Sequence, residues 1–294
     1  METAAVAILP FPYEGGVSYG KGAAGAPEQV LRASHYLELY DEVYGHEFHT
    51  AGITTAAPPA IPSDAAGMIQ AMETASSALL NQGKFVCVLG GDHSVSSGFF
   101  NALHRIRGVK SVIQIDAHTD LREEYEGNRL SHACVMARIR QHTRHTLHIG
   151  IRSMSKPESV RIKEQHIPCV TMHDLRAGEI DIGHYLEQLP DPVFLTFDVD
   201  ALDWSIISST GTPEPGGLLW HETMEILEKI FFTKDVAGCD IVELAANPAD
   251  ANSPFAAAKL LYKMITLKIL SSIKRNNTGV PLAPCGPILQ PDML

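Results

Sequence analysis

Short apolar runs that alternate with longer helical patterns are the feature that most constrains how this chain can fold. Several runs, such as VCVLG from Val86 and VFLTF from Val193, are apolar almost throughout, which is typical of strands covered on both faces. The expected strands are Ala5–Leu9, Phe85–Leu89, Ser111–Ile115, Thr146–Ile151, Pro168–Met172, Val193–Phe197 and Gly238–Glu243. The expected helices are Asp64–Asn81, Val95–Arg107, Pro157–Gln165, His221–Phe232 and Ser253–Ser272. This alternation predicts an α/β fold, with a mostly parallel central sheet between two layers of helices.

The length of the chain favours one large unit. Its 294 residues suit a single α/β domain and contain no internal repeat, low-complexity tract or obvious linker. We therefore expect one domain over residues 1–294, with an irregular extension from about Asn276 that contains four prolines.

Composition narrows the classes of partner. Acidic residues outnumber basic ones 34 to 23, and the resulting charge of −11 disfavours nucleic acid as the main ligand. A small cation or a metal ion suits this balance, although solubility alone would explain it equally well. No run of about eighteen apolar residues is present, so the sequence predicts no membrane span. The N-terminus lacks the basic region of a signal peptide, so we expect none there. The five dispersed cysteines predict thiols in a reducing cytoplasm.

Three of the expected strands end in clusters of histidine and aspartate. The clusters read GGDHS at residues 90–94, DAHTD at 116–120 and DVDALD at 198–203. Ligands of parallel sheets bind beyond the carboxyl ends of the strands, which is where these clusters lie. In extended backbone, residues two apart point to one face, so Asp116 should project with His118, and Asp198 with Asp200.

The charges of these clusters predict a metal centre. Four carboxylates follow the strands: Asp116, Asp120, Asp198 and Asp200. Together they would repel and raise one another's pKa values, whereas two divalent cations would cancel their formal charge. Oxygen-rich ligation with about one imidazole per ion, from His93 and His118, favours Mn²⁺ over structural zinc. One such cluster alone is more often a helix cap or a surface loop, but three together predict a binuclear site.

These motifs resemble the signature sequences of the ureohydrolases, the family of arginases and agmatinases. Besides the three clusters, the matching segments are GAPEQVLR at 25–32, GTPEPGGL at 211–218, and DIVE at 240–243 followed by Asn247-Pro248. The resemblance runs in order from about Pro10 to Leu270. It implies the arginase-like α/β/α fold with three layers.

The resemblance also implies a ligand set. One manganese ion would be held by His93, Asp116, Asp120 and Asp198. The other would be held by Asp116, His118, Asp198 and Asp200, so that Asp116 and Asp198 bridge the two Mn²⁺. In the family pattern Asp92 and Asp203 are not ligands, and we expect them to orient neighbouring groups.

Three catalytic roles follow from the same resemblance. His132, in the segment LSHA, corresponds to the family's mobile histidine and would protonate the leaving amine. Glu243 matches the carboxylate that binds the guanidinium group, and Asp120 would orient the attacking water. Without the family match, a salt-bridged carboxylate at a strand end is the simpler interpretation of Glu243.

The resemblance implies hydrolysis of a guanidine to urea and an amine. The segment GTPEPGGL and the REEYEG loop at 122–127 resemble those of agmatinases. The expected reaction is therefore the hydrolysis of agmatine to putrescine and urea. Arginase or guanidinobutyrase activity remains open, because Asn128 and Ser131 could contact an amino acid and Ala133-Cys134-Val135 departs from the family pattern. A non-catalytic metal-binding relative and a deacetylase of the same broad fold are further alternatives. The family implies a homo-oligomer, commonly a trimer or hexamer.

Overall fold

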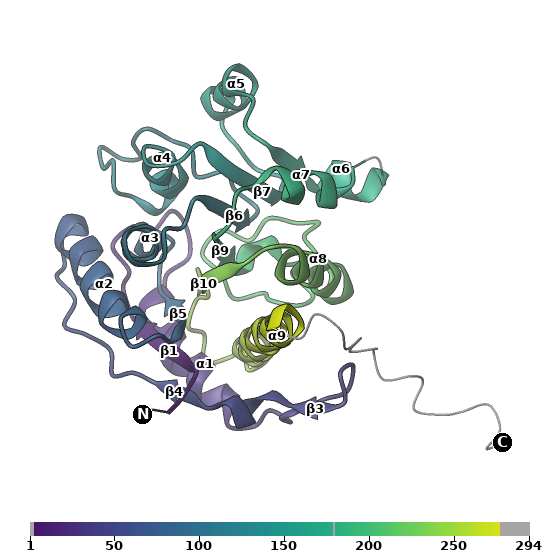
Figure 1. Cartoon of the computed structure of the whole chain (residues 1–294). Coiled ribbons are helices and arrows are strands. Elements are labelled where there is room, and N and C mark those ends of the chain that lie inside the picture. The colour runs from purple at the N-terminus through teal and green to yellow at the C-terminus, as the bar shows by residue number, and fades with distance from the viewer. Residues whose placement is uncertain (1–2, 179, 277–294) are drawn as a thin grey trace.

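A parallel sheet forms the centre of the molecule in the computed structural model, which describes residues 3–178 and 180–276 (Figure 1). Its eight strands lie in the order β4-β1-β5-β10-β9-β6-β7-β8, and every pairing between them is parallel. The strands of this sheet are β1 Val6–Phe11, β4 Ile53–Thr55, β5 Phe85–Gly90, β6 Ser111–Ile115, β7 His145–Ile151, β8 Cys169–Thr171, β9 Val193–Asp198 and β10 Val236–Val242. A small antiparallel pair, β2 Tyr40–Asp41 and β3 His46–Glu47, lies outside it.

Helices cover both faces of the sheet. The α-helices are α1 Ala26–Ser34, α2 Ala65–Leu80, α3 Val95–Arg107, α4 Val135–Ile139, α5 Lys156–Gln165, α6 Met172–Ala177, α7 Ile182–Gln188, α8 Trp220–Thr233 and α9 Asn252–Asn276. Short 3-10 turns are η1 Ala23–Gly25, η2 Phe48–Ala51, η3 His132–Cys134 and η4 Val199–Ala201. Two separate apolar cores show the layering, one under α2 to α5 and the other under α1 and α6 to α9. The expected three-layer α/β/α fold is therefore confirmed (Figure 1).

The central strands are buried on both faces, as their continuous apolar sequences predict. Every residue of β5, β6 and β9 is buried. Local signals set the helix ends: Asp64 accepts from the backbone N–H of Gly67 at the start of α2, Ser155 and Glu158 form a capping box on α5, and Gly108 ends α3 in a left-handed conformation.

The seven expected strands and five expected helices are present, with ends that differ by up to four residues, the largest difference being at the end of α9. The elements not predicted from the sequence are mostly one or two turns long or lie at the sheet edge; they are α1, α4, α6, α7, β4 and the small β2–β3 pair. The irregular tail expected beyond residue 276 lies outside the described residues, and the single-domain organisation stays a prediction. Among the described residues, no helix combines the length and apolar character that a membrane crossing requires.

Four neighbouring strands position the site. β5, β10, β9 and β6 are adjacent and parallel, so their carboxyl ends open onto one edge of the sheet. The histidine and aspartate clusters lie at the carboxyl ends of β5, β6 and β9, and the DIVE segment ends β10, with Glu243 directly after the strand. Residues more than a hundred positions apart are thereby brought together.

Candidate active site

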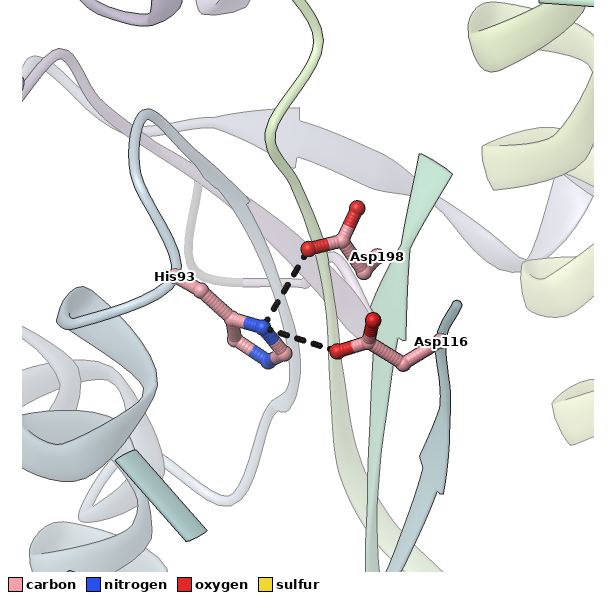
Figure 2. A group of neighbouring side chains, drawn as sticks. All are labelled: His93, Asp116 and Asp198. Atoms are coloured by element: carbon pink, nitrogen blue, oxygen red, sulfur yellow. Dashed lines mark ion pairs between the residues drawn. The ribbon is translucent and has the colours of Figure 1, made fainter. Parts of the chain in front are cut away.

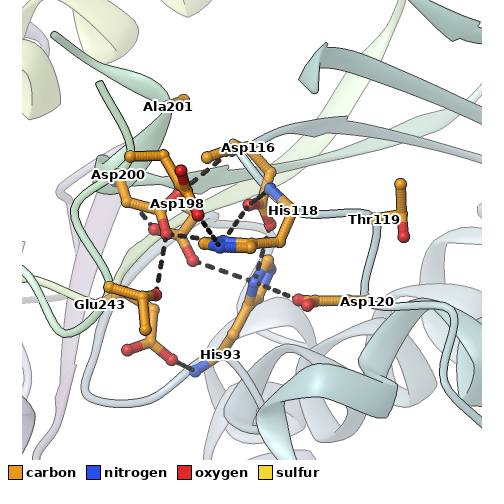
Figure 3. A network of polar contacts seen from close by, with 12 residues as sticks. His93, Asp116, His118, Thr119, Asp120, Asp198, Asp200, Ala201 and Glu243 are labelled. Atoms are coloured by element: carbon orange, nitrogen blue, oxygen red, sulfur yellow. Dashed lines mark hydrogen bonds and ion pairs between the residues drawn. The ribbon is translucent and has the colours of Figure 1, made fainter. Parts of the chain in front are cut away.

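The carboxyl ends of three central strands, β5, β6 and β9, carry the predicted metal ligands (Figure 3). His93 follows β5, Asp116 lies directly after β6, and Asp198 is the last residue of β9. Of the six predicted ligands, five are buried, and His118 keeps 25% of its side chain exposed. The structure thus brings together groups that the sequence scatters over residues 93 to 200.

Tight turns, rather than extended strands, make the paired residues converge. Asp116 Oδ1 accepts a hydrogen bond from the N–H of His118 at 2.6 Å, and Asp198 Oδ1 accepts one from the N–H of Asp200 at 2.9 Å. Asp200 lies in the turn η4. The expectation that each pair shares one face of extended backbone is therefore wrong, because the strands end at or before the first aspartate of each pair. The side chains meet because a carboxylate caps the turn that follows it.

The first cluster forms around His93. Its Nδ1 lies 3.2 Å from Asp116 Oδ2, 2.9 Å from Asp120 Oδ2 and 3.3 Å from Asp198 Oδ2. Figure 2 shows the ring edge turned toward Asp116 and Asp198, which lie at the carboxyl ends of the neighbouring strands β6 and β9. These four residues are the set expected for one manganese ion.

The second cluster forms around His118. Its Nδ1 lies 2.9 Å from Asp200 Oδ2 and 3.7 Å from Asp116 Oδ1. The N–H of Ala117 donates to the other oxygen of Asp200 at 3.1 Å. Asp116 contributes one carboxylate oxygen to each cluster, which is the arrangement of a bridging ligand.

The electrostatics of the two clusters call for added positive charge. Burial, together with the charge of Asp116, raises the pKa of Asp120 to about 7, and burial with the charges of Asp200 and Asp116 raises the pKa of Asp198. Burial would raise the pKa of Asp116, but its contacts with the imidazoles of His118 and His93 outweigh this effect and lower the pKa, against the expectation that all the carboxylates raise one another.

The histidines respond in the opposite sense. Although burial lowers the pKa of His118, contacts with Asp116 and Asp200 raise it to about 12, and His93 shifts in the same direction. Protons and divalent cations would thus compete for the same positions.

The donor set fits divalent cations. His93 Nδ1 is fully buried and has no hydrogen-bond partner within the part of the chain that the structure describes. Its other nitrogen, Nε2, lies 2.9 Å from Thr196 Oγ1. A nitrogen lone pair facing several carboxylate oxygens is a cation site, and two groups of ligand atoms with this geometry are present, His93-Asp116-Asp198 and Asp116-His118-Asp200.

Glu243 lies beside these clusters and lines the same cavity. Its Oε1 accepts a hydrogen bond from the N–H of His93 at 2.6 Å, and its own N–H donates to Gly91 O at 2.8 Å. Burial, with the charge of Asp92 second, raises the pKa of the Glu243 carboxyl. No ion pair joins Glu243 to a basic side chain among the described residues, so the salt-bridge interpretation finds no support.

Two site carboxylates stand on unusual backbone. Asp120 has a φ of 50° and Glu243 a φ of 64°, in the left-handed region that residues with a Cβ seldom adopt. Such conformations persist where the surrounding structure imposes them, and they cluster at functional sites.

His132 also lines this cavity, which has a volume of about 230 Å³. Its Nε2 lies 2.9 Å from Ser18 Oγ, its Nδ1 lies 3.2 Å from Ser131 Oγ, and the ring of Tyr125 packs edge-on against it. Burial lowers the pKa of the His132 ring. The imidazole is therefore neutral near pH 7 and can accept or pass on a proton.

The two aspartates not expected to be ligands form turns. Asp92 Oδ2 accepts from the N–H groups of Gly15 and Gly16 at 2.7 and 2.9 Å, which holds the N-terminal loop over the site. Asp203 accepts from Ser205 in an exposed turn. Asp92 therefore shapes the cavity wall, because the loop that it holds contains Ser18.

The sequence analysis missed several side chains of the site. Ser18 contacts His132 from 114 positions away, and Thr212 donates to Asp200 Oδ2 at 3.4 Å. Gln114 donates to Asp116 Oδ2 at 2.6 Å from within β6. Thr212 lies in the GTPEPGGL segment, so this family motif could have indicated it. Ser18 and Gln114 belong to none of the motifs recognised in the sequence.

The sequence matches that of a known family. The profile of the arginase family matches residues 4–266. The chain belongs to the arginase family. The N(1)-aminopropylagmatine ureohydrolase of Synechocystis sp. is 39% identical over 272 residues, which cover 89% of this chain and 88% of that protein. The agmatinase of Pyrococcus horikoshii is 34% identical over 261 residues, covering 88% and 90%.

Solved structures agree with the sequence comparison. The crystal structure of the agmatine ureohydrolase of Thermoplasma volcanium superposes with a TM-score of 0.85 at 28% identity, covering 94% of this chain and 93% of that one. This member of the arginase family is an agmatinase-like ureohydrolase, a hydrolase that acts on guanidino compounds.

Proposed function

We propose that this protein binds two Mn²⁺ ions and hydrolyses a guanidine with an amine-bearing tail to urea and an amine. The observation that carries the proposal is the convergence of both ligand clusters, Glu243 and His132 on one cavity. A binuclear site with an adjacent free carboxylate suits a substrate that is planar and positively charged.

The proposed ligands divide as the family pattern implies. His93 and Asp120 would hold the first ion, and His118 and Asp200 the second, while Asp116 and Asp198 would contribute to both. Two bound cations would supply a water molecule that is deprotonated near neutral pH and would stabilise negative charge that develops during the reaction.

Glu243 would bind the guanidinium group. Its Oε1 already accepts from the N–H of His93, so the orientation of the carboxylate is set before substrate enters. Its other oxygen is available to N–H groups of the substrate. In a buried cavity such a charge-assisted bond is stronger than in water, because few solvent dipoles compete for the carboxylate.

Asp120 would orient the attacking water, and His132 would handle the proton of the leaving amine. Asp120 Oδ2 lies 2.9 Å from His93 Nδ1, beside the position proposed for the first ion. His132 is neutral and is hydrogen-bonded to Ser18 and Ser131, which places its ring at the cavity wall. We propose that His132 relays a proton: one ring nitrogen gives its proton to the departing amine while the other takes up the proton that the attacking water loses, so that the ring is neutral before and after the step.

Agmatine is the substrate that we propose first, with putrescine and urea as products. A second candidate has a specific observation in its favour, because the relative that is 39% identical is named N(1)-aminopropylagmatine ureohydrolase. That compound carries the same guanidinium group on a longer chain with one more amine. Removal of urea from it would leave a triamine in place of the diamine putrescine.

Urea release from four guanidines distinguishes these possibilities. Metal-stripped protein reloaded with Mn²⁺ would be given agmatine, N(1)-aminopropylagmatine, arginine or guanidinobutyrate at equal concentration. We expect one of the first two to have the highest kcat/KM. Arginine or guanidinobutyrate as the best substrate would contradict the proposal, and urea from none of them would favour a non-catalytic relative.

Assembly and location belong to the same proposal. We propose a homo-oligomer, a trimer or hexamer as the family implies, that acts in the cytoplasm and needs neither nucleic acid nor a membrane. Light scattering of the purified protein checks the first point, and a monomer at micromolar concentration would contradict it.

A further inference from the structure

A row of buried polar side chains crosses the sheet directly beneath the site. Asp240 of β10 is in register with Thr196 of β9, Thr196 with Gln114 of β6, and Gln114 with His148 of β7. All four residues are completely buried. Asp198 lies two positions beyond Thr196, and Asp116 two beyond Gln114, so this polar row lies on the same face, one step below these two carboxylates.

Asp240 begins a directed chain of hydrogen bonds that ends at His93. Its Oδ1 accepts from the N–H of Phe197 at 3.2 Å, and its Oδ2 accepts from Ser96 Oγ at 2.6 Å. Because both oxygens accept, the hydroxyl proton of Ser96 points to Asp240. Ser96 Oγ can then only accept from its next neighbour.

That neighbour is Thr196, whose hydroxyl donates to Ser96 Oγ at 3.4 Å. With its proton committed, Thr196 Oγ1 accepts at the other side, where His93 Nε2 lies at 2.9 Å. The proton of a neutral His93 ring is therefore on Nε2, and the lone pair is on Nδ1. Nδ1 is the buried atom that faces Asp116, Asp120 and Asp198.

We propose that Asp240 is a positioning residue that, through Ser96 and Thr196, holds His93 in the tautomer and orientation required of a metal ligand. The inference rests on the proposed metal centre and adds to it a buried carboxylate that touches neither metal nor substrate. Removing a carboxylate that orients a ligating histidine commonly weakens metal binding by about 10- to 100-fold.

The substitution Asp240→Asn tests the direction of the chain. The N–H of Phe197 requires an acceptor, so the amide oxygen would stay at the Oδ1 position and the NH₂ group would face Ser96. Ser96 would then donate to Thr196, and Thr196 to His93 Nε2. This reversal places the ring proton on Nδ1, where it blocks the cation.

Thr196→Val removes the acceptor at His93 Nε2 with little change in volume, and Thr196→Ser restores it. Thr266→Val is a matched control, because Thr266 is equally buried in α9 and its hydroxyl has no partner among the described residues. Calorimetric titration of the metal-stripped proteins with Mn²⁺ measures affinity, and thermal unfolding of the same samples measures stability.

We expect Asp240→Asn and Thr196→Val to bind Mn²⁺ about 10- to 100-fold more weakly than the parent, with Thr196→Ser close to the parent and Thr266→Val unchanged. Equal affinity in all variants would overturn the inference while leaving the metal centre intact, as would Thr196→Ser binding as weakly as Thr196→Val. No Mn²⁺ binding by the parent protein would remove both the inference and the proposed metal centre. If Asp240→Asn does not fold, Ser96→Ala takes its place, because it breaks the path from Asp240 to Thr196 and should weaken Mn²⁺ binding in the same way.

Discussion

Glu243→Gln would separate recognition of the substrate from binding of the metals. The N–H of His93 donates to Oε1 of Glu243 at 2.6 Å, and a glutamine must keep its oxygen there. Its NH₂ group would then face the cavity. A donor would meet the N–H groups of the guanidinium where the parent offers a negatively charged acceptor.

The size of the effect follows from burial. Removing one partner of a buried, hydrogen-bonded charge pair costs about 3–5 kcal/mol, because the other charge stays buried without compensation. At about 1.4 kcal/mol per tenfold, kcat/KM should fall by about 100- to 4,000-fold. Affinity for Mn²⁺ should stay within about threefold, because Glu243 is not a proposed ligand and its bond to His93 is kept.

The assay is urea release by the Mn²⁺-loaded protein over a range of substrate concentrations. Glu228→Gln is a suitable control, because this substitution also replaces a carboxylate by an amide. Glu228 lies on α8, where it accepts a hydrogen bond from Tyr44. A Glu243→Gln protein with kcat/KM within about threefold of the parent would refute the assigned role, since that difference is below 1 kcal/mol. An equal loss in Glu228→Gln would show that the effect is not specific to the site.

Further predictions concern stability and reactivity. Burial raises the pKa of Asp250, but hydrogen bonds from three serines lower it below its usual value, so its stabilising effect is present at neutral pH and lost as the pH falls. Asp250→Ala should lower the free energy of unfolding by about 1–2 kcal/mol at pH 7, with a smaller difference below about pH 4 in chemical denaturation. Gly91→Ala should destabilise by about 3 kcal/mol or more in the same measurement, because its Cβ would overlap the carbonyl oxygen of Tyr13. Burial raises the pKa values of the Cys134 and Cys169 thiols to about 11 and 12, so mass spectrometry should find both unmodified by iodoacetamide at pH 8 unless the protein is unfolded.

Apolar patterning predicted most of the fold. Strands such as β6 and β9 were found within a residue because they are buried on both faces and therefore uniformly apolar. The short elements were missed for the converse reason. Helix α4 has five residues and β4 has three, too few for a periodicity to stand out from the neighbouring loops.

The candidate site was predicted as far as its motifs extend. His93, Asp116 and Asp198 lie in motifs that are recognisable in the sequence. Asp240 entered the sequence analysis only as the first residue of DIVE, and His148 did not enter it at all. Their roles depend on strand register: Asp240 reaches His93 through residues of α3 and β9, and His148 Nδ1 meets Gln114 Oε1 at 2.5 Å across β6 and β7. No local pattern encodes which strands will be neighbours, so the polar row could not be found before the sheet order was known.

The left-handed backbone at Asp120 and Glu243 implies that stability and catalytic activity favour different residues at these two positions. A residue with a Cβ loses about 1–2 kcal/mol at such a position relative to an unstrained one, and only glycine is free of that penalty. Selection for thermal stability alone should therefore favour glycine at positions 120 and 243. The selected variants would be more stable but catalytically inactive.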